Sequence, residues 1–196
     1  MSKRLWIIAG PNGAGKSTLV SKYNLNQLPV SNPDVIAQRL SPSAPEAAMV
    51  QAGRQAIKER SLHFTKGNSF ILETTFSGKT AISTISNAQS KGYKVNLVFV
   101  ALKSSRGSML RVDTRVRSGG HFVSAEDIQR RYTRASENLK KAIPIADRTF
   151  IIDNTGQRPF LIARLEKGVV KKVRSRIPKW IDELLPLLKK QQGLSR

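Results

Sequence analysis

Short apolar runs alternate with longer stretches of helical spacing along the 196-residue chain. Nearly uninterrupted apolar runs are typical of strands buried on both faces. They occur at residues 4–10, 69–74, 94–102 and 148–154. Apolar residues recur every three or four positions, as in helices, at residues 15–23, 45–67, 77–92, 104–118 and 125–143. This alternation predicts an α/β fold, a three-layer α/β/α sandwich with a mostly parallel sheet.

The end of the chain follows a different pattern. Two apolar runs flank Glu166-Lys167-Gly168 within residues 160–173, which predicts a β-hairpin. An amphipathic helical segment follows at 178–190, and we expect Pro186 to interrupt it. We therefore expect one domain over residues 1–196, with a basic C-terminal extension at about 157–196.

Composition narrows the possible partners. Lys and Arg number 34 against 13 Asp and Glu, which gives a net charge of +21. A basic surface attracts polyanions, so nucleic acid is one candidate partner, but a basic composition without such a partner fits equally well. The chain contains no cysteine, which excludes disulfides and thiolate metal sites.

We find no signal peptide and no apolar stretch of membrane-spanning length, and we expect a cytoplasmic protein.

The most specific motif lies between the first predicted strand and the next helix. Residues 10–17, GPNGAGKS, fit G-x-x-x-x-G-K-[ST], the phosphate-binding loop. Its glycines let backbone N–H groups surround phosphate, Lys16 faces the β- and γ-phosphates, and Ser17 offers a hydroxyl to Mg²⁺. We therefore expect ATP and Mg²⁺ as cofactors. The predicted nucleotide-binding residues are Gly10, Pro11, Asn12, Gly13, Ala14, Gly15, Lys16, Ser17 and Thr18.

The strand at 148–154 helps to separate kinases from motor ATPases. Its apolar run ends on Asp153, the position of a magnesium carboxylate in P-loop motors, but Asn154 follows it. We find no second acid there to orient a hydrolytic water, and no guanine-specificity motif. The pattern favours a small kinase over a motor or a switch.

Two acids are candidates for acting on a phosphate acceptor. Asp34 follows Pro33 at the start of a predicted helix, and Glu73 ends the apolar strand at 69–74. Both fall at the carboxyl edge of the predicted sheet, where α/β proteins build their sites. A kinase needs a carboxylate that takes the proton of the acceptor hydroxyl, although Asp34 could equally stabilise its helix N-terminus.

Glu73 has two functional interpretations. With Thr74 and Thr75 it could bind a polyhydroxylated acceptor, or it could support the magnesium ion. A purely structural Glu73 is less favoured, because a carboxylate at the end of a buried strand is costly unless it has a partner.

The helix–loop–helix at about 104–143 is rich in arginine. Gly119 and Gly120 allow a hinge between its helices. The segment predicts a lid that closes over the nucleotide and stabilises the charge of the transferred phosphoryl group, although a solvated basic helix pair has the same composition. Candidate catalytic residues here are Arg117, Arg131 and Arg134, and candidate acceptor-binding residues are Arg115 and His121.

The order of these motifs resembles the zeta-toxin-like P-loop kinases, in the short branch without an antitoxin domain. The resemblance rests on GPNGAGKST, NPDVIA, ETTFSG, RVRSGGHFV, IQRRYTRASENL, ADR and DN, and it covers about residues 4–155. Better-known family members phosphorylate the amino sugar of UDP-N-acetylglucosamine. The resemblance implies that Asp34 is the acceptor base, that Glu73, Thr74 and Thr75 hold the acceptor, and that an antitoxin protein is a candidate partner.

We therefore expect an ATP- and Mg²⁺-dependent kinase that phosphorylates a hydroxyl of a small anionic acceptor, with UDP-N-acetylglucosamine as the leading candidate. One alternative is a kinase that acts on RNA or a nucleotide, which the charge of +21 favours and the low aromatic content of 6% opposes. A second alternative is a P-loop ATPase or a nucleotide-gated binding module.

Overall fold

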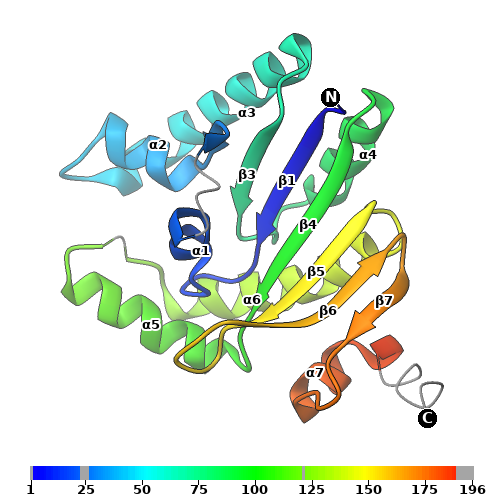
Figure 1. Ribbon diagram of the computed structural model, residues 1–196. Helices are drawn as coiled ribbons and strands as arrows, with labels where there is room; N and C mark the ends of the chain where they lie inside the picture. Colours follow the sequence, from blue (N-terminus) through cyan, green and yellow to red (C-terminus); the bar gives the residue numbers. More distant parts are fainter. Residues whose placement is uncertain (1, 23–26, 121, 189–196) are drawn as a thin grey trace.

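The computed structural model describes residues 2–22, 27–120 and 122–188, and Figure 1 shows its arrangement. The strands are β1 Arg4–Ala9, β2 Val30–Ser31, β3 Phe70–Thr74, β4 Lys94–Ala101, β5 Arg148–Asp153, β6 Phe160–Glu166 and β7 Val169–Val173. The helices are α1 Lys16–Lys22, α2 Pro33–Leu40, α3 Met49–Lys66, α4 Ala81–Ser90, α5 Ser105–Arg117, α6 Ala125–Ala142 and α7 Lys179–Leu184. No helix within these residues has the length and apolar character needed to span a membrane.

The strands form one sheet in the order β2-β3-β1-β4-β5-β6-β7. The pairs from β2 to β5 are parallel, and β6 and β7 add antiparallel strands at one side. This confirms the predicted α/β class with a mostly parallel sheet. Because parallel strands end at the same edge, the segments that follow β1, β2 and β3 meet there.

The helices pack on both faces of the sheet (Figure 1). On one face, α4 and α6 bury Ile85 and Leu139 in the main core with Leu97 of β4. On the opposite face, Val20 of α1 packs against Ile8 of β1. Burial of each large apolar side chain contributes about 1.5–3 kcal/mol. These contacts hold the loop between β1 and α1 in place.

The end of the chain matches its prediction. Lys167 and Gly168 form the turn between β6 and β7, with positive φ of 46° and 80°. This pair of left-handed residues is typical of a tight hairpin turn. The helix α7 ends at Leu184, and a 3-10 turn begins at Pro186, as expected from the missing N–H of proline.

Three elements differ from the expected pattern. The helix expected over residues 77–92 spans only Ala81–Ser90. The strand β2 was not predicted, because two residues show no readable alternation; its pairing with β3, Ser31 beside Leu72, defines it. The helix expected from residue 45 begins instead with a 3-10 turn over Pro45–Ala48, and no side chain caps that turn. The predicted stop at Gly67 is confirmed, with φ of 67°.

Candidate active site

The phosphate-binding loop follows β1 and runs into α1. Its glycines Gly10, Gly13 and Gly15 have positive φ of 145°, 70° and 85°. A Cβ at Gly10 would lie 2.2 Å from the carbonyl oxygen of Val100 on the neighbouring strand, so this position requires glycine. The backbone therefore has the left-handed turns that the sequence motif predicts.

Side chains from distant segments brace this loop. The Asn154 amide, just after β5, donates a hydrogen bond of 2.8 Å to the Ala14 carbonyl. The Ser108 hydroxyl of α5 donates to the Asn12 carbonyl. Both donors bind carbonyls of the loop and so do not compete for its N–H groups, of which that of Ala14 donates to the Pro11 carbonyl at 3.2 Å. The first helix of the arginine-rich segment is thus packed directly against the loop.

Ser17 and Glu73 form the central contact of the site. The Ser17 hydroxyl donates a hydrogen bond of 2.6 Å to Oε1 of Glu73. Strand pairing explains this contact, because β1 and β3 are parallel neighbours with Ile8 beside Glu73. Glu73 is only 7% exposed, so its carboxylate has the partner that its burial requires.

A pocket of about 320 Å³ opens beside this contact at the carboxyl edge of the sheet. Its lining brings together six of the residues selected from the sequence. They are Lys16, Asp34, Glu73, Thr74, Thr75 and Arg131. Asp34 reaches the pocket from the first turn of α2, whose N-cap Asn32 accepts a hydrogen bond of 2.9 Å from the Asp34 N–H. The capped helix start fixes where the carboxylate stands.

Opposing charges meet at Lys16. Its ammonium donates a hydrogen bond of 3.0 Å to the Pro11 carbonyl. Burial lowers the pKa of Lys16, while the negative charges of Glu73 and Asp34 act to raise it. The positive charges of Arg115 and Arg131 also lower this pKa. The Lys16 ammonium, at the end of the phosphate-binding loop, therefore interacts with charged groups from four other elements, α2, β3, α5 and α6.

The other selected residues stand apart from the pocket. Arg117 is exposed and forms an ion pair of 2.9 Å with Asp113 on its own helix. Arg134 is exposed on α6 and is not among the residues that line the pocket. His121 lies outside the described residues. The structure thus brings only part of the arginine-rich segment close to Lys16.

The loop after β3 has an unusual conformation that the sequence does not reveal. Phe76 is buried with a φ of 60°, which is rare for a residue other than glycine. The Asn138 side chain of α6 donates hydrogen bonds to the carbonyls of Phe76 at 2.8 Å and Gly78 at 3.2 Å. In the same loop, the Thr75 and Ser77 hydroxyls lie 2.9 Å apart. Asn138 therefore positions one wall of the pocket.

A second pocket, of about 340 Å³, adjoins the other side of the phosphate-binding loop. Arg111, Asn154 and Gln157 line it together with Gly15 and Thr18. The sequence alone assigns no site role to Arg111, Asn154 or Gln157. One available signal was the position of Asn154, directly after a strand at the carboxyl edge of the sheet.

Arg111 ties this second pocket together. Its guanidinium donates to the carbonyls of Gly13 at 3.4 Å, Thr155 at 3.1 Å and Gly156 at 3.3 Å. The helix α5, the phosphate-binding loop and the β5–β6 loop thus form one connected wall.

The donor set at Ser17 fits a magnesium ion that is shared with phosphates. In such sites Mg²⁺ takes one or two protein oxygens, and the phosphates and water supply the rest. Ser17 and Glu73 are the matching pair here. The described residues contain no cluster of three or more His, Asp or Glu side chains that could hold a metal on its own. Asp153 is buried and accepts a hydrogen bond of 2.8 Å from the Thr155 N–H.

Comparison with known proteins identifies relatives in sequence and in fold. The zeta toxin family model matches residues 1–164. An uncharacterized protein of Haemophilus influenzae is 33% identical over 138 residues, which cover 66% of this chain and 98% of that protein.

Among solved structures, a chain of the AvrRxo1-ORF1:AvrRxo1-ORF2 complex with sulphate ions has a TM-score of 0.72 at 15% identity. The match covers 97% of this chain and 64% of that chain, so this chain spans less than two thirds of that relative. A chain of the PezAT toxin–antitoxin system of Streptococcus pneumoniae has a TM-score of 0.65 at 15% identity and covers 100% of this chain and 88% of that one. At these identities the likeness is one of fold. The sequence match shows that the chain belongs to the zeta toxin family, and the chain is a P-loop kinase.

Proposed function

We propose that this kinase transfers the γ-phosphoryl group of ATP to a hydroxyl of a small anionic acceptor, and that UDP-N-acetylglucosamine is the first acceptor to test. The observation that carries the proposal is the pocket that places the Asp34 carboxylate in one cavity with Lys16 and Glu73. A carboxylate beside a phosphate-binding loop is the arrangement that an acceptor kinase needs.

The nucleotide would occupy the loop and the second pocket. Backbone N–H groups and Lys16 would hold the β- and γ-phosphates. The pocket at Arg111, Asn154 and Gln157 has room and polar groups for the nucleoside. Ser17 and Glu73 are the residues that would hold Mg²⁺, which, when bound, neutralises charge on the β- and γ-phosphates.

The acceptor would enter the pocket at Asp34. The oxygen of the acceptor hydroxyl forms a bond to the γ-phosphorus of ATP, while the Asp34 carboxylate takes the proton of this hydroxyl. At the same time, the bond between the γ-phosphorus and the bridging oxygen of the β-phosphate breaks. ADP leaves with its pair of electrons, and the proton stays on Asp34 until water removes it. Thr74, Thr75 and Ser77 offer hydroxyl groups that suit a sugar.

The arginines are assigned by their surroundings. Arg131 lines the pocket, and Arg115 acts electrostatically on Lys16, so we assign the stabilisation of phosphoryl charge to these two. Arg117 and Arg134 are assigned to the surface of the lid, about 104–143, in the conformation described here. The role of His121 at the acceptor stays a prediction.

The proposal extends to the setting of the enzyme. We infer one kinase domain over residues 1–196, a basic extension from about 157, a cytoplasmic location and an antitoxin protein as partner. The family match supports the antitoxin. The partner can be tested by co-purification of the tagged protein from its host cells and identification of the protein that it retains.

The test is transfer of label from γ-labelled ATP, with Mg²⁺, to UDP-sugars, nucleosides and short RNAs. Label on UDP-N-acetylglucosamine that disappears in Lys16→Ala and Asp34→Asn would establish the proposed reaction. Label on RNA would instead show that the charge of +21 indicates the acceptor. Phosphate released to water with every acceptor ignored would make the protein an ATPase and overturn the proposal.

A further inference from the structure

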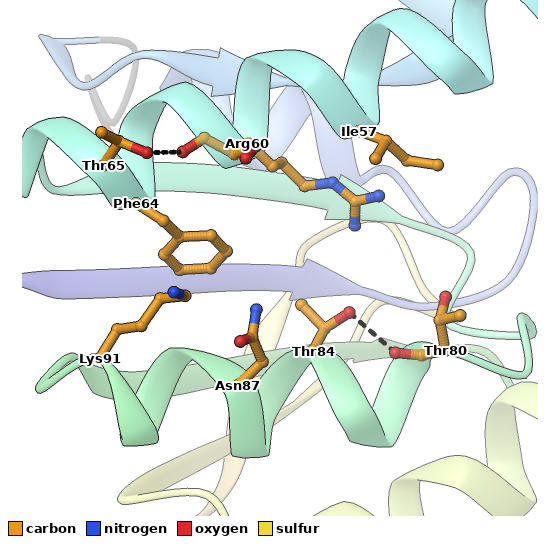
Figure 2. Close-up of a pocket in the computed structure, with 9 residues that line it drawn as sticks. Ile57, Arg60, Phe64, Thr65, Thr80, Thr84, Asn87 and Lys91 are labelled. Carbon is orange, nitrogen blue, oxygen red and sulfur yellow. Dashed lines mark hydrogen bonds between the residues drawn. The ribbon is translucent and has the colours of Figure 1, made fainter.

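A groove of about 350 Å³ lies between α3 and α4. It shares no lining residue with the two pockets at the phosphate-binding loop. Figure 2 shows its walls, with Arg60 and Phe64 on α3 facing Thr84, Asn87 and Lys91 on the opposite side. The proposed reaction uses none of these side chains. The groove is therefore a second concave surface whose chemistry needs an explanation.

The groove is positively charged. Arg60 and Lys91 line it, and no acidic residue does. Arg60 is half-buried, and its Nε donates a hydrogen bond of 3.3 Å to the Ala56 carbonyl of its own helix. In the described part of the chain, no carboxylate pairs with Arg60 or Lys91.

Burial without a counter-ion is unfavourable for Arg60. Burial lowers the pKa of this guanidinium, which nevertheless stays protonated because arginine is so strongly basic. A desolvated cation without an anion is a costly arrangement. A ligand with a phosphate or carboxylate group would remove this cost, and planar guanidinium groups bind such anions through two parallel hydrogen bonds.

The remaining walls suit the rest of a small molecule. The side chains of Ser61, Thr80 and Asn87 line the groove and make no hydrogen bond within the described residues. The Phe64 ring faces the same space (Figure 2). Polar groups without partners beside an aromatic ring are typical of sites for polar organic ligands.

The groove is adjacent to the proposed acceptor pocket. A small cavity of about 50 Å³ lies between the two. It shares Arg60, Thr80 and Thr84 with the groove. It also shares Thr74 and Gly78 with the pocket at Asp34. The space around Gly78 is open, with no atom within 4 Å of a Cβ built there. The groove, the small cavity and the pocket at Asp34 are therefore linked by shared wall residues.

We propose that the α3–α4 groove binds an anionic group, phosphate or carboxylate, at the far end of the acceptor, through Arg60 and Lys91. The inference rests on the proposed acceptor kinase function. It makes Arg60 a specificity-determining residue: acceptors with an anionic group remote from the reacting hydroxyl are favoured over neutral ones.

Kinetics provide the first test, with the anionic acceptor identified by the transfer assay. Arg60→Gln and Lys91→Gln should each raise the acceptor KM by about 10- to 100-fold, the effect of one lost charged hydrogen bond. The kcat and the KM for ATP should stay unchanged. Arg60→Lys should recover part of the affinity, and Lys58→Gln, at an exposed position of α3 outside the groove, should behave as wild type. A neutral analogue of the acceptor should show no dependence on Arg60.

Direct binding provides a test that needs no transfer. The protein saturated with ADP and Mg²⁺, which fills the phosphate-binding loop, is titrated with inorganic phosphate and, separately, with acetate, and amide shifts are followed by NMR. Saturable shifts at Arg60, Thr84 and Lys91 that Arg60→Gln removes would support the groove as an anion site. The stronger of the two probes would identify the anion as phosphate or carboxylate.

The two proposals can fail separately. Saturable binding at Arg60 without transfer to any acceptor would overturn the proposed function and leave the groove as an anion site. The groove proposal would be overturned by two results together. The acceptor KM would be the same in wild type, Arg60→Gln and Lys91→Gln while transfer is normal, and NMR would show no saturable shifts. Correct folding of Arg60→Gln is checked by its unchanged KM for ATP, and Lys91→Gln, on the opposite wall, gives an independent variant.

Discussion

The hydroxyl of Ser17 donates a 2.6 Å hydrogen bond to the carboxylate of Glu73, across 56 residues of chain. This contact joins the phosphate-binding loop to the strand end that also carries Thr74 and Thr75. The sequence leaves two roles open for Glu73, acceptor binding and support of magnesium. The hydrogen bond to the Ser17 hydroxyl, which we propose as a magnesium ligand, favours the second role, although Glu73 also lines the proposed acceptor pocket.

Glu73→Gln tests that role. Glutamine retains an oxygen that can accept the Ser17 hydrogen bond, so we expect the fold to persist while the negative charge is lost. The Mg²⁺ concentration required for half-maximal transfer should rise by about 10- to 100-fold. A magnesium titration of the transfer rate measures this, with Glu59→Gln on α3 as the control. An unchanged magnesium requirement with a raised acceptor KM would instead assign Glu73 to the acceptor.

Asp34→Asn tests the acceptor base. The amide cannot accept a proton at neutral pH, so kcat for transfer should fall by about 10²- to 10⁴-fold. The Asn32 cap binds the backbone of residue 34, so the helix start should remain intact. The affinity for ATP, measured by calorimetry, should be unchanged. Asp113→Asn, which removes only an exposed ion pair, should retain full activity. Full transfer by Asp34→Asn would leave Asp34 as a helix-stabilising residue.

The arginine assignment is tested by a matched pair. Arg131→Gln removes a charge from the pocket and should lower kcat by about 10²- to 10³-fold. Arg117→Gln removes one partner of an exposed ion pair and should change stability by less than about 1 kcal/mol and leave kcat unchanged. The experiment compares kcat for the two variants in saturating substrate. A large loss in Arg117→Gln would mean that the lid closes further than the described conformation and brings Arg117 to the phosphates.

Local patterns were sufficient to predict most of the fold. The strands β1, β3, β4 and β5 are short apolar runs, which is the pattern of strands buried in a parallel sheet. The glycines of the phosphate-binding loop have the positive φ values that the motif predicts. The strand β2 has no such pattern, because it exists through pairing with β3. Its two residues could be placed only after the sheet was known.

The site residues differ in the same way. Asp34 and Glu73 were selected because their positions at strand and helix ends can be identified in the sequence. Arg111 and Asn138 were not selected, because their functional contacts are with backbone carbonyls of segments 44 to 98 residues distant. Because every residue has a backbone carbonyl, the amino-acid sequence does not show which residue will accept such a hydrogen bond. The arginines of α5 and α6 were recognised as a group, but only their orientation in the folded chain separates Arg131 from Arg117.

The burial of Lys16 predicts that this residue lowers stability while it enables nucleotide binding. Burial lowers the pKa of Lys16 below its ordinary value of 10.5. Between the lowered pKa and 10.5, the unfolded chain binds more protons than the folded chain, so the unfolding free energy of wild type rises with pH in that window. Below the window, Lys16 is charged in both states, and the folded state carries the full cost of desolvation.

Lys16→Met should therefore raise Tm at pH 7, without nucleotide, by about 1–3 °C. The advantage should shrink as the pH approaches 10.5, because wild-type Lys16 then loses its proton. With saturating ATP the order should reverse, since only wild type gains stability from the bound nucleotide. Tm values measured from pH 7 to 10, with exposed Lys58→Met as the control, check this. A lower Tm for Lys16→Met at pH 7 would mean that the hydrogen bond to Pro11 and the attraction of Glu73 and Asp34 outweigh desolvation.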